Sequence, residues 1–279
     1  SRILGMVRDA LTAHFIGSGL TWDAFVIAYR IPNLFRRLFG EGALTAAFVP
    51  AFVTRWASGR EADARTLFNR VLSQTGALLL ALVTIGIGVT FLLPTFSSDP
   101  KTGLLSVLLR IMLPYLFFIC TAAIFAATLQ SLRHFAMPAF APVLLNVIWI
   151  AALFTRDIRI VAWAIVAGGA VQLGAMVLPL ARRGVTYRPD FATDDGVREV
   201  RATFVPVVLG LALIQINELV DSIIAELCVP GHGAVSALYY GNQLTQLPLA
   251  VIGTALATAA FPLFSSPALR ENPRLFAAT

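Results

Sequence analysis

Long stretches without a charged side chain dominate the chain. Five of them contain no Asp, Glu, Lys or Arg, and they cover residues 71–98, 111–132, 135–155, 160–181 and 227–269. About 20 apolar residues in a helix, each rising 1.5 Å, span the roughly 30 Å hydrocarbon core of a bilayer. Each stretch is therefore long enough for a membrane-spanning helix, and the last also has room for a helix end and a turn.

The first sixty residues are apolar too, but charges interrupt them, and a Gly-Ser-Gly sequence at 17–19 divides them into two segments. The whole pattern predicts eight spans, at about 1–17, 22–54, 70–95, 104–132, 138–155, 159–181, 200–227 and 234–264. We therefore expect an all-α, polytopic membrane helix bundle. The chain opens at Ser1 within an apolar segment and shows no signal peptide, so we expect that a native start has been lost.

Composition agrees with this interpretation. Of the 279 residues 58% are apolar and 13% are charged, whereas soluble domains have about 45–50% and about 25%. This excludes a soluble enzyme. The formal charge of +6 is explained better by membrane topology than by nucleic-acid binding. Neither the cysteines nor the histidines have a metal-binding spacing, and no catalytic constellation is visible, so we predict no metal, no catalytic residue and no nucleic-acid partner.

Basic residues alternate between the predicted connections. One set of connections has twelve, Arg55, Arg60, Arg65, Arg70, Arg133, Arg182, Arg183, Arg188, Arg198, Arg201, Arg270 and Arg274, and the other set has Lys101, Arg156 and Arg159. Cytoplasmic loops carry the excess of Lys and Arg. The count predicts a cytoplasmic N-terminus, a cytoplasmic connection at 182–199, and turns at 17–19 and 230–233 on the outer side.

Charged residues inside the first two predicted helices are candidates for a binding site. They are Arg2, Arg8, Asp9, Asp23, Arg30, Arg36, Arg37 and Glu41. A charge facing lipid costs about 3 kcal/mol at the centre of a helix, so these groups should line an aqueous cavity or pair within the protein. Arg8 and Asp9 are neighbours on one polar face, which suggests a cationic wall for an anionic ligand, with Asp9 holding a guanidinium. The alternative is that Arg2 and Arg8 extend to the headgroups.

Pro32 interrupts the second helix between Arg30 and Arg36, next to Asn33. Proline removes a backbone hydrogen bond and favours a kink, and broken helices line transporter sites. Arg37 and Glu41 are four residues apart, which fits either a surface ion pair or a gate.

The sequence SRILGMVRD at residues 1–9 resembles the S-R-x-L-G-x-x-R-D opening of the MurJ/MviN family of lipid II flippases. Further motifs of that family follow in order: DAF at 23–25, PNLFRR at 32–37, EGA at 41–43, AFVP at 47–50, PAFAP at 138–142, LN at 145–146, QIN at 215–217 with Asp221, LYY at 238–240, QLP at 246–248 and FP at 261–262. The resemblance implies an exporter fold with two six-helix lobes and two extra helices. This chain would supply a first lobe (1–181), a cytoplasmic connection (182–199) and two helices of the second lobe (200–279), and would be a fragment.

The resemblance also implies a function, which is to flip the undecaprenyl-diphosphate-linked peptidoglycan precursor, lipid II, to the outer leaflet of a bacterial inner membrane by alternating access. Lipid II, the bilayer and the peptidoglycan synthesis machinery would be the partners. No cofactor is implied beyond a coupling ion or the membrane potential. The implied substrate-binding residues are Arg2, Arg8, Asp9, Asp23, Asn33 and Arg36, and the implied gate residues are Arg37 and Glu41. A related exporter of other lipid-linked saccharides or drugs, or a noncatalytic membrane scaffold, remains the alternative.

Two features of the C-terminal part refine this expectation. The family has an arginine after Tyr-Tyr-x-x on the eighth helix, where this chain has Gln243, so one cationic contact to a diphosphate is replaced by a neutral amide. Asn217 and Asp221, four residues apart on the seventh helix, are candidates for ion coupling. Glu226 lies farther along that helix. For this residue, an unpaired acid at the membrane interface is as good an interpretation as a role in ion coupling.

Overall fold

In the computed structural model, the residues described are 2–38, 43–92, 94, 99–229 and 233–248. They form helices joined by short connections, with no strand among them, which confirms the all-α prediction. The helices are α1 (Arg2–Phe15), α2 (Leu20–Leu38), α3 (Leu44–Ala57), α4 (Glu61–Thr90), α6 (Pro100–Ser131), α7 (Ala136–Leu153), α8 (Ile158–Ala181), α9 (Asp195–Cys228) and α10 (Ala234–Pro248).

The chain divides into two compact units, Ser1–Val235 and Ser236–Thr279. The first unit contains α1 to α9, and α10 belongs almost wholly to the second. All the predicted site residues except Gln243 fall within the first unit. The division into transporter lobes at 181 and 200 stays a prediction.

Five helices in the described part, α4, α6, α7, α8 and α9, are long and apolar enough to cross a membrane. All five correspond to predicted spans. Two helices, α2 and α3, occupy the described parts of the span expected at 22–54, and α2 ends at Leu38 while α3 begins at Leu44. Residues 39–42 lie outside the described residues, so the single helix expected there stays a prediction.

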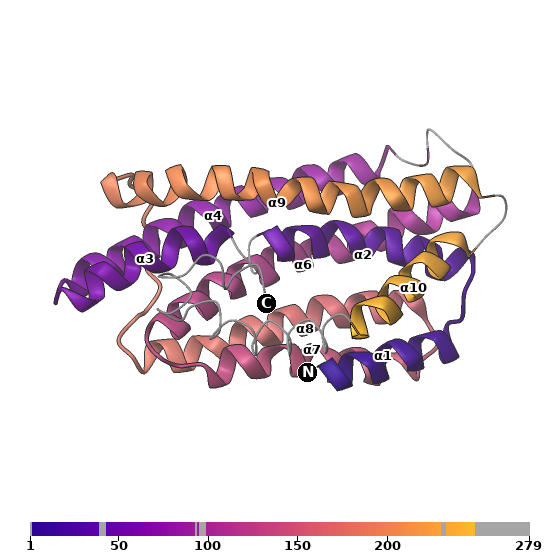
Figure 1. Ribbon diagram of the computed structural model, residues 1–279, viewed down its shortest axis with the longest axis horizontal. Helices are drawn as coiled ribbons and strands as arrows, with labels where there is room; N and C mark the ends of the chain where they lie inside the picture. The colour runs from indigo at the N-terminus through magenta and orange to yellow at the C-terminus, as the bar shows by residue number, and fades with distance from the viewer. Residues whose placement is uncertain (1, 39–42, 93, 95–98, 230–232, 249–279) are drawn as a thin grey trace, which may run out of the picture. The chain divides into compact units, whose positions relative to one another are not determined.

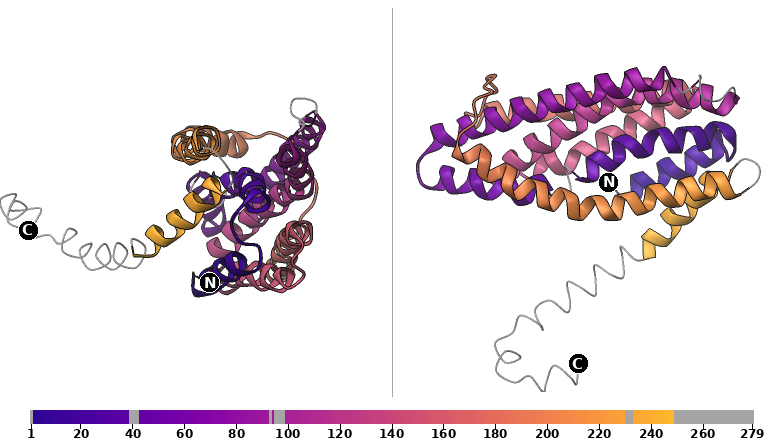
Figure 2. Two further views of the ribbon diagram at one scale, coloured as in Figure 1. Left: turned by 90° about the vertical axis from the view of Figure 1, so that its right-hand side faces the viewer. Right: turned by 90° about the horizontal axis from the view of Figure 1, so that it is seen from above.

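Helix α6 lies at the centre of the first unit. It packs against α2, α4 and α8, while α7 packs on α8 and α1 packs on α7 (Figure 1). Helix α9 packs mainly on α3 and also contacts α2 and α4 (Figure 2). The turn between α1 and α2 lies at the predicted Gly-Ser-Gly sequence, where Gly17 has φ 78°, a left-handed conformation that glycine adopts without steric cost.

Two adjacent glycines allow α8 to approach its neighbours closely. A Cβ atom on Gly168 would lie 2.5 Å from Cδ1 of Leu145 on α7, and one on Gly169 would lie 2.6 Å from Cδ2 of Tyr115 on α6. One turn later, the buried amide of Gln172 donates to the backbone oxygen of Ala141 on α7 at 2.8 Å. Gly168 and Gly169 therefore mark a close contact of α8 with α7 and α6.

The arginine-rich connections gather at one end of the first unit. The turns between α3 and α4 and between α6 and α7, and the connection from α8 to α9, all lie at the left in Figure 1, whereas Lys101 begins α6 at the opposite end. The helices therefore alternate in direction as the charge count required. We call the two ends the arginine-rich end and the Lys101 end.

The connection at 182–194 is bound to α4 along its length. Arg70 pairs with Asp190 at 2.9 Å and with Asp194 at 2.6 Å, and the Gln74 amide donates to the backbone oxygens of Phe191 and Ala192. Asp194 also caps α9, accepting the backbone N–H of Val197.

Both acids of this connection ionise more readily than usual. The backbone N–H of Ala192 and then the Arg70 guanidinium lower the pKa of Asp190. For Asp194, burial raises the pKa, but the Val197 N–H and Arg70 together outweigh it, so the net pKa is lowered. The connection is therefore held by carboxylates that stay charged well into the acid range.

Candidate functional site

Arg8 is held in one orientation by groups from two helices. Its Nε and Nη2 atoms donate to Oδ1 of Asp9 at 2.9 and 2.7 Å, and its Nη1 donates to Oδ1 of Asn146 on α7 at 3.1 Å. Asn146 is fixed in turn, because its amide nitrogen donates to the backbone oxygen of Pro142 at 2.9 Å. The predicted pairing of Arg8 with Asp9 is therefore present, with a third partner that is 138 residues away.

An aromatic wall supports the same guanidinium. Arg8 lies over the ring of Trp149 at 4.5 Å from the centroid. The Trp149 ring meets Phe25 and Tyr29 of α2 edge-on, at 5.7 and 5.3 Å, and Tyr29 stacks at 6.5 Å on Tyr115 of α6. A cation over an aromatic face is attracted by the ring quadrupole. The wall therefore stabilises the charge of Arg8 without neutralising it.

Arg36 approaches this wall from α2. Its Nε donates to Oδ1 of Asn33 at 2.9 Å, and Arg36 lies seven residues after Tyr29, on the same face of α2. Tyr115 and Trp149 are fully buried, and neither the phenol oxygen nor the indole nitrogen has a hydrogen-bond partner among the described residues. We call Arg8, Arg36, Tyr29, Tyr115 and Trp149 the arginine–aromatic cluster.

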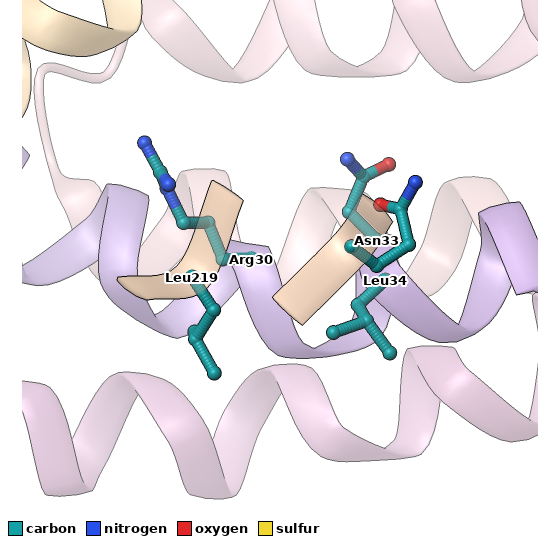
Figure 3. Close-up of a pocket in the computed structure, with 5 residues that line it drawn as sticks. Arg30, Asn33, Leu34 and Leu219 are labelled. Carbon is teal, nitrogen blue, oxygen red and sulfur yellow. The ribbon is translucent and has the colours of Figure 1, made fainter. Parts of the chain in front are cut away.

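A small pocket adjoins the cluster where α2 meets α9. Arg30, Asn33 and Leu34 of α2 line it, together with Gln215 and Leu219 of α9 (Figure 3). The spacing of three and four residues places each set on one face of its helix. Arg37 also reaches α9, donating to Oε1 of Gln215 at 3.4 Å. Asn33 thus belongs to both the pocket and the surroundings of Arg36.

Asp23 lies apart from these residues. It is 13 positions before Arg36 on α2, a separation of about 20 Å along the axis. Its buried carboxylate accepts the backbone N–H of Gly233 at 2.6 Å and lies 3.5 Å from Nζ of Lys101, which also pairs with Glu226. The alternative that Glu226 is an unpaired acid is therefore wrong. We call Asp23, Lys101 and Glu226 the Lys101 cluster.

The remaining predicted site residues belong to none of these three groups. Glu41 and the side chain of Arg2 are outside the described residues. Asn217 and Asp221 have exposed positions on α9, and their role in ion coupling stays a prediction. Gln243 lies on α10 in the second unit, where its amide donates to the Tyr239 hydroxyl at 3.4 Å.

Sequence reasoning missed several members of these groups. Trp149, Tyr29 and Tyr115 lie in apolar stretches and are indistinguishable there from ordinary core residues. Asn146 and Gln215 lie within quoted family motifs, which was the available signal, and Lys101 was counted only as a loop charge. Among the described residues no three His, Cys, Asp or Glu side chains gather as a metal site. The arrangement offers fixed guanidinium groups on an apolar wall, which suits binding of a phosphate or carboxylate.

Comparisons with known proteins give one consistent result. The family model described as lipid II flippase MurJ matches residues 12–279. A probable lipid II flippase MurJ from Vibrio cholerae serotype O1 is 36% identical, over 95% of this chain and 54% of that protein. A probable lipid II flippase MurJ from Haemophilus influenzae is 34% identical, over 94% and 55%.

A solved structure, lipid II flippase MurJ in an inward closed conformation, matches with a TM-score of 0.79 at 25% identity, covering 92% of this chain and 55% of that one. The chain thus spans about half the length of these relatives.

Proposed function

This chain belongs to the MurJ family of lipid II flippases, and from that premise we propose that it takes part in moving lipid II across a bacterial inner membrane. In this proposal it forms the first lobe, the cytoplasmic connection and the opening two helices of the second lobe of a full-length flippase. The arginine-rich end faces the cytoplasm, as does the N-terminus. The protein acts as a transporter and not as an enzyme.

The observation that best supports this function is the fixed geometry of Arg8. A diphosphate cannot enter hydrocarbon without groups that replace its hydration, and guanidinium groups do this with paired, directional hydrogen bonds. Asp9, Asn146 and Trp149 already hold Arg8 in place, so little conformational entropy is lost when an anion binds. Arg36 supplies a second cation beside the same aromatic wall.

The outer surface of the first unit suits the lipid part of such a substrate. Large apolar side chains are exposed along several helices, among them Leu78 and Ile85 on α4 and Leu209 and Leu213 on α9. Such side chains are compatible with acyl or prenyl chains. A polyprenyl tail could therefore stay in the bilayer while the diphosphate enters the site.

The other predicted site residues also have roles in this proposal. Arg2, Asp9, Asn33 and the pocket at α2 and α9 contribute to the substrate site, and Arg37 with Glu41 acts as a gate. Asn217 and Asp221 belong to a coupling site for an ion, or respond to the membrane potential. The peptidoglycan synthesis machinery supplies or receives the substrate.

The decisive test replaces Arg8 in a full-length flippase that contains this chain. A bacterium depleted of its own flippase receives the parent, Arg8→Lys, Arg8→Ala, or the control Arg198→Ala, whose arginine is exposed at the arginine-rich end. Lipid II in the outer leaflet is then quantified. We expect rescue by the parent and the control, roughly tenfold or greater loss with alanine, and partial activity with lysine, which keeps the charge but not the fork of donors.

Full rescue by Arg8→Ala would refute the role of this arginine. Failure of a well-inserted parent to rescue growth would refute lipid II as the substrate and would favour a related exporter of other lipid-linked saccharides. The neutral Gln243 would then be the first suspected cause of the changed substrate.

A further inference from the structure

Three helix ends meet at Lys101. This lysine follows Pro100 in the first turn of α6, Asp23 lies in the first turn of α2, and Glu226 lies in the last turn of α9. Figure 1 shows these three ends together, opposite the arginine-rich end. One ammonium group therefore joins two helices of the proposed first lobe to the first helix of the proposed second lobe.

The three charges differ strongly in burial. The side chains of Asp23 and Lys101 are 1% and 7% exposed, whereas that of Glu226 is 33% exposed. Removing a buried charge from its only counter-charge is costly, because the remaining ion is left desolvated. A partly exposed carboxylate can regain hydration with little further movement. The buried Asp23 and the partly exposed Glu226 are therefore not equivalent partners for Lys101.

Glu226 and Asp23 contact Lys101 at different distances. Glu226 contacts Lys101 through both carboxylate oxygens, while Asp23 lies farther away, at 3.5 Å. Asp23 also accepts the backbone N–H of Gly233, just after the end of α9, at 2.6 Å. Lys101 thus has a second acid within reach, and this acid belongs to α2 and not to α9.

We propose that Lys101 is a two-position charge switch that controls separation of α9 from α2 and α6 at the Lys101 end. With α9 in place, Lys101 is shared between Glu226 and Asp23. When the end of α9 moves away, Glu226 enters water and Lys101 pairs fully with Asp23, so no buried ion is left without a partner. This inference rests on the proposed function, because an alternating-access transporter must open and close such an end.

The switch makes an unusual prediction, namely that neutralising the two acids has opposite effects. Glu226→Gln weakens only the state in which α9 is in place, so it favours separation. Asp23→Asn leaves Lys101 without a counter-charge in the separated state, so it favours the state with α9 in place. The asparagine keeps a carbonyl oxygen for the Gly233 N–H. A cluster that only stabilised the fold would respond in the same direction to both changes.

A cysteine reporter on α9 measures the separation. Ser222 is buried one turn before Glu226, whereas the native Cys228 is exposed and Cys120 is buried. We would use the full-length protein in lipid nanodiscs with Ser222→Cys and Cys228→Ser, leaving Cys120 in place, and measure the rate of labelling by a maleimide without lipid II. Cys228 in the otherwise unchanged protein serves as the exposed reference. Asp195→Asn is the matched control, because Asp195 lies at the start of α9, at the arginine-rich end, and its side chain is 99% exposed.

We expect Glu226→Gln to raise the rate roughly tenfold, Asp23→Asn to lower it, and Asp195→Asn to leave it unchanged. Unchanged labelling in Glu226→Gln, or a rise in both cluster variants, would overturn the switch. The measurement uses neither lipid II nor a defined side of the membrane. Its failure is therefore distinguishable from a failure of the proposed flippase activity, which the rescue assay reports.

Discussion

Adding one methyl group at Gly169 should disturb both the packing of α8 and the wall beneath Arg8. An alanine Cβ there would lie 2.6 and 2.9 Å from two ring carbons of Tyr115 and 3.2 Å from Cβ of Phe118. Carbon atoms prefer separations of about 3.5–4.0 Å, so the ring or the helix must move by about 1 Å. Tyr115 is fully buried and stacks on Tyr29, so its ring has no free space to enter.

The magnitude is set by two opposed contributions. Overpacking a buried contact costs about 1–3 kcal/mol, while replacing glycine by alanine within a helix gains up to about 1 kcal/mol. Gly174→Ala reports the second contribution alone, because Gly174 lies on the same helix and a Cβ there would meet nothing within 4 Å. The difference between the two variants then isolates the overpacking. We therefore expect Gly174→Ala to be neutral or stabilising, and Gly169→Ala to be less stable than Gly174→Ala by about 1–3 kcal/mol.

Thermal unfolding of the two full-length variants in the same detergent provides the assay. A difference of 1 kcal/mol corresponds to roughly 2–4 °C in Tm for a protein of 150–250 residues and to less for a longer one, so in the full-length protein Gly169→Ala should melt about 1–4 °C below Gly174→Ala. It should also bind a diphosphate lipid more weakly, because the displaced ring belongs to the arginine–aromatic cluster. Equal melting temperatures for the two variants would refute the close contact between α8 and α6.

Three further changes test other parts of the molecule. Asp190 and Asp194 in the 182–194 connection have lowered pKa values, so the stability that they contribute is complete above about pH 4 and is lost as the pH falls through the lowered values. A spin label in this connection should therefore become mobile only in acid. In Arg70→Gln the label should become mobile at a higher pH than in the parent. Trp149→Leu removes the ring beneath Arg8, and we expect affinity for a diphosphate lipid to fall about twofold to fivefold, from a cation–π contribution of about 0.5–1 kcal/mol, with unchanged insertion. Gln243→Arg should raise that affinity, and weaker binding would argue against a substrate contact at this position.

The hydropathy pattern predicts the long helices well, because an apolar stretch of this length has few other stable conformations in a membrane. It is less exact about where helices begin, since α4 and α9 start at Glu61 and Asp195, before the apolar stretches that predicted them. Adjacent or periodic charges such as Arg8 and Asp9 are also predictable, since helix geometry fixes their relative positions.

Contacts between distant residues are not predictable in this way. Asn146 and Trp149 reach Arg8 from a helix far along the chain, and nothing in the periodicity of α7 indicates which side chain meets α1. Lys101 illustrates the same limit, because a charge at a helix start is compatible with a hydrated loop. Its burial follows only from the convergence of α2, α6 and α9.

The two ends of α9 are attached to the rest of the first unit by different groups, and this has a mechanical consequence. At its start, Arg55 binds Glu199, Arg201 binds Gln74, and the bound 182–194 connection leads directly into the helix. Toward its far end, contacts among the described residues include those of the Lys101 cluster and the Gly233 N–H. The 34 residues of α9 form a rod about 51 Å long. A tilt of about 10° around the fixed start would carry the far end through about 9 Å, so the helix acts as a lever that converts a small rotation at the arginine-rich end into a wide displacement at the other.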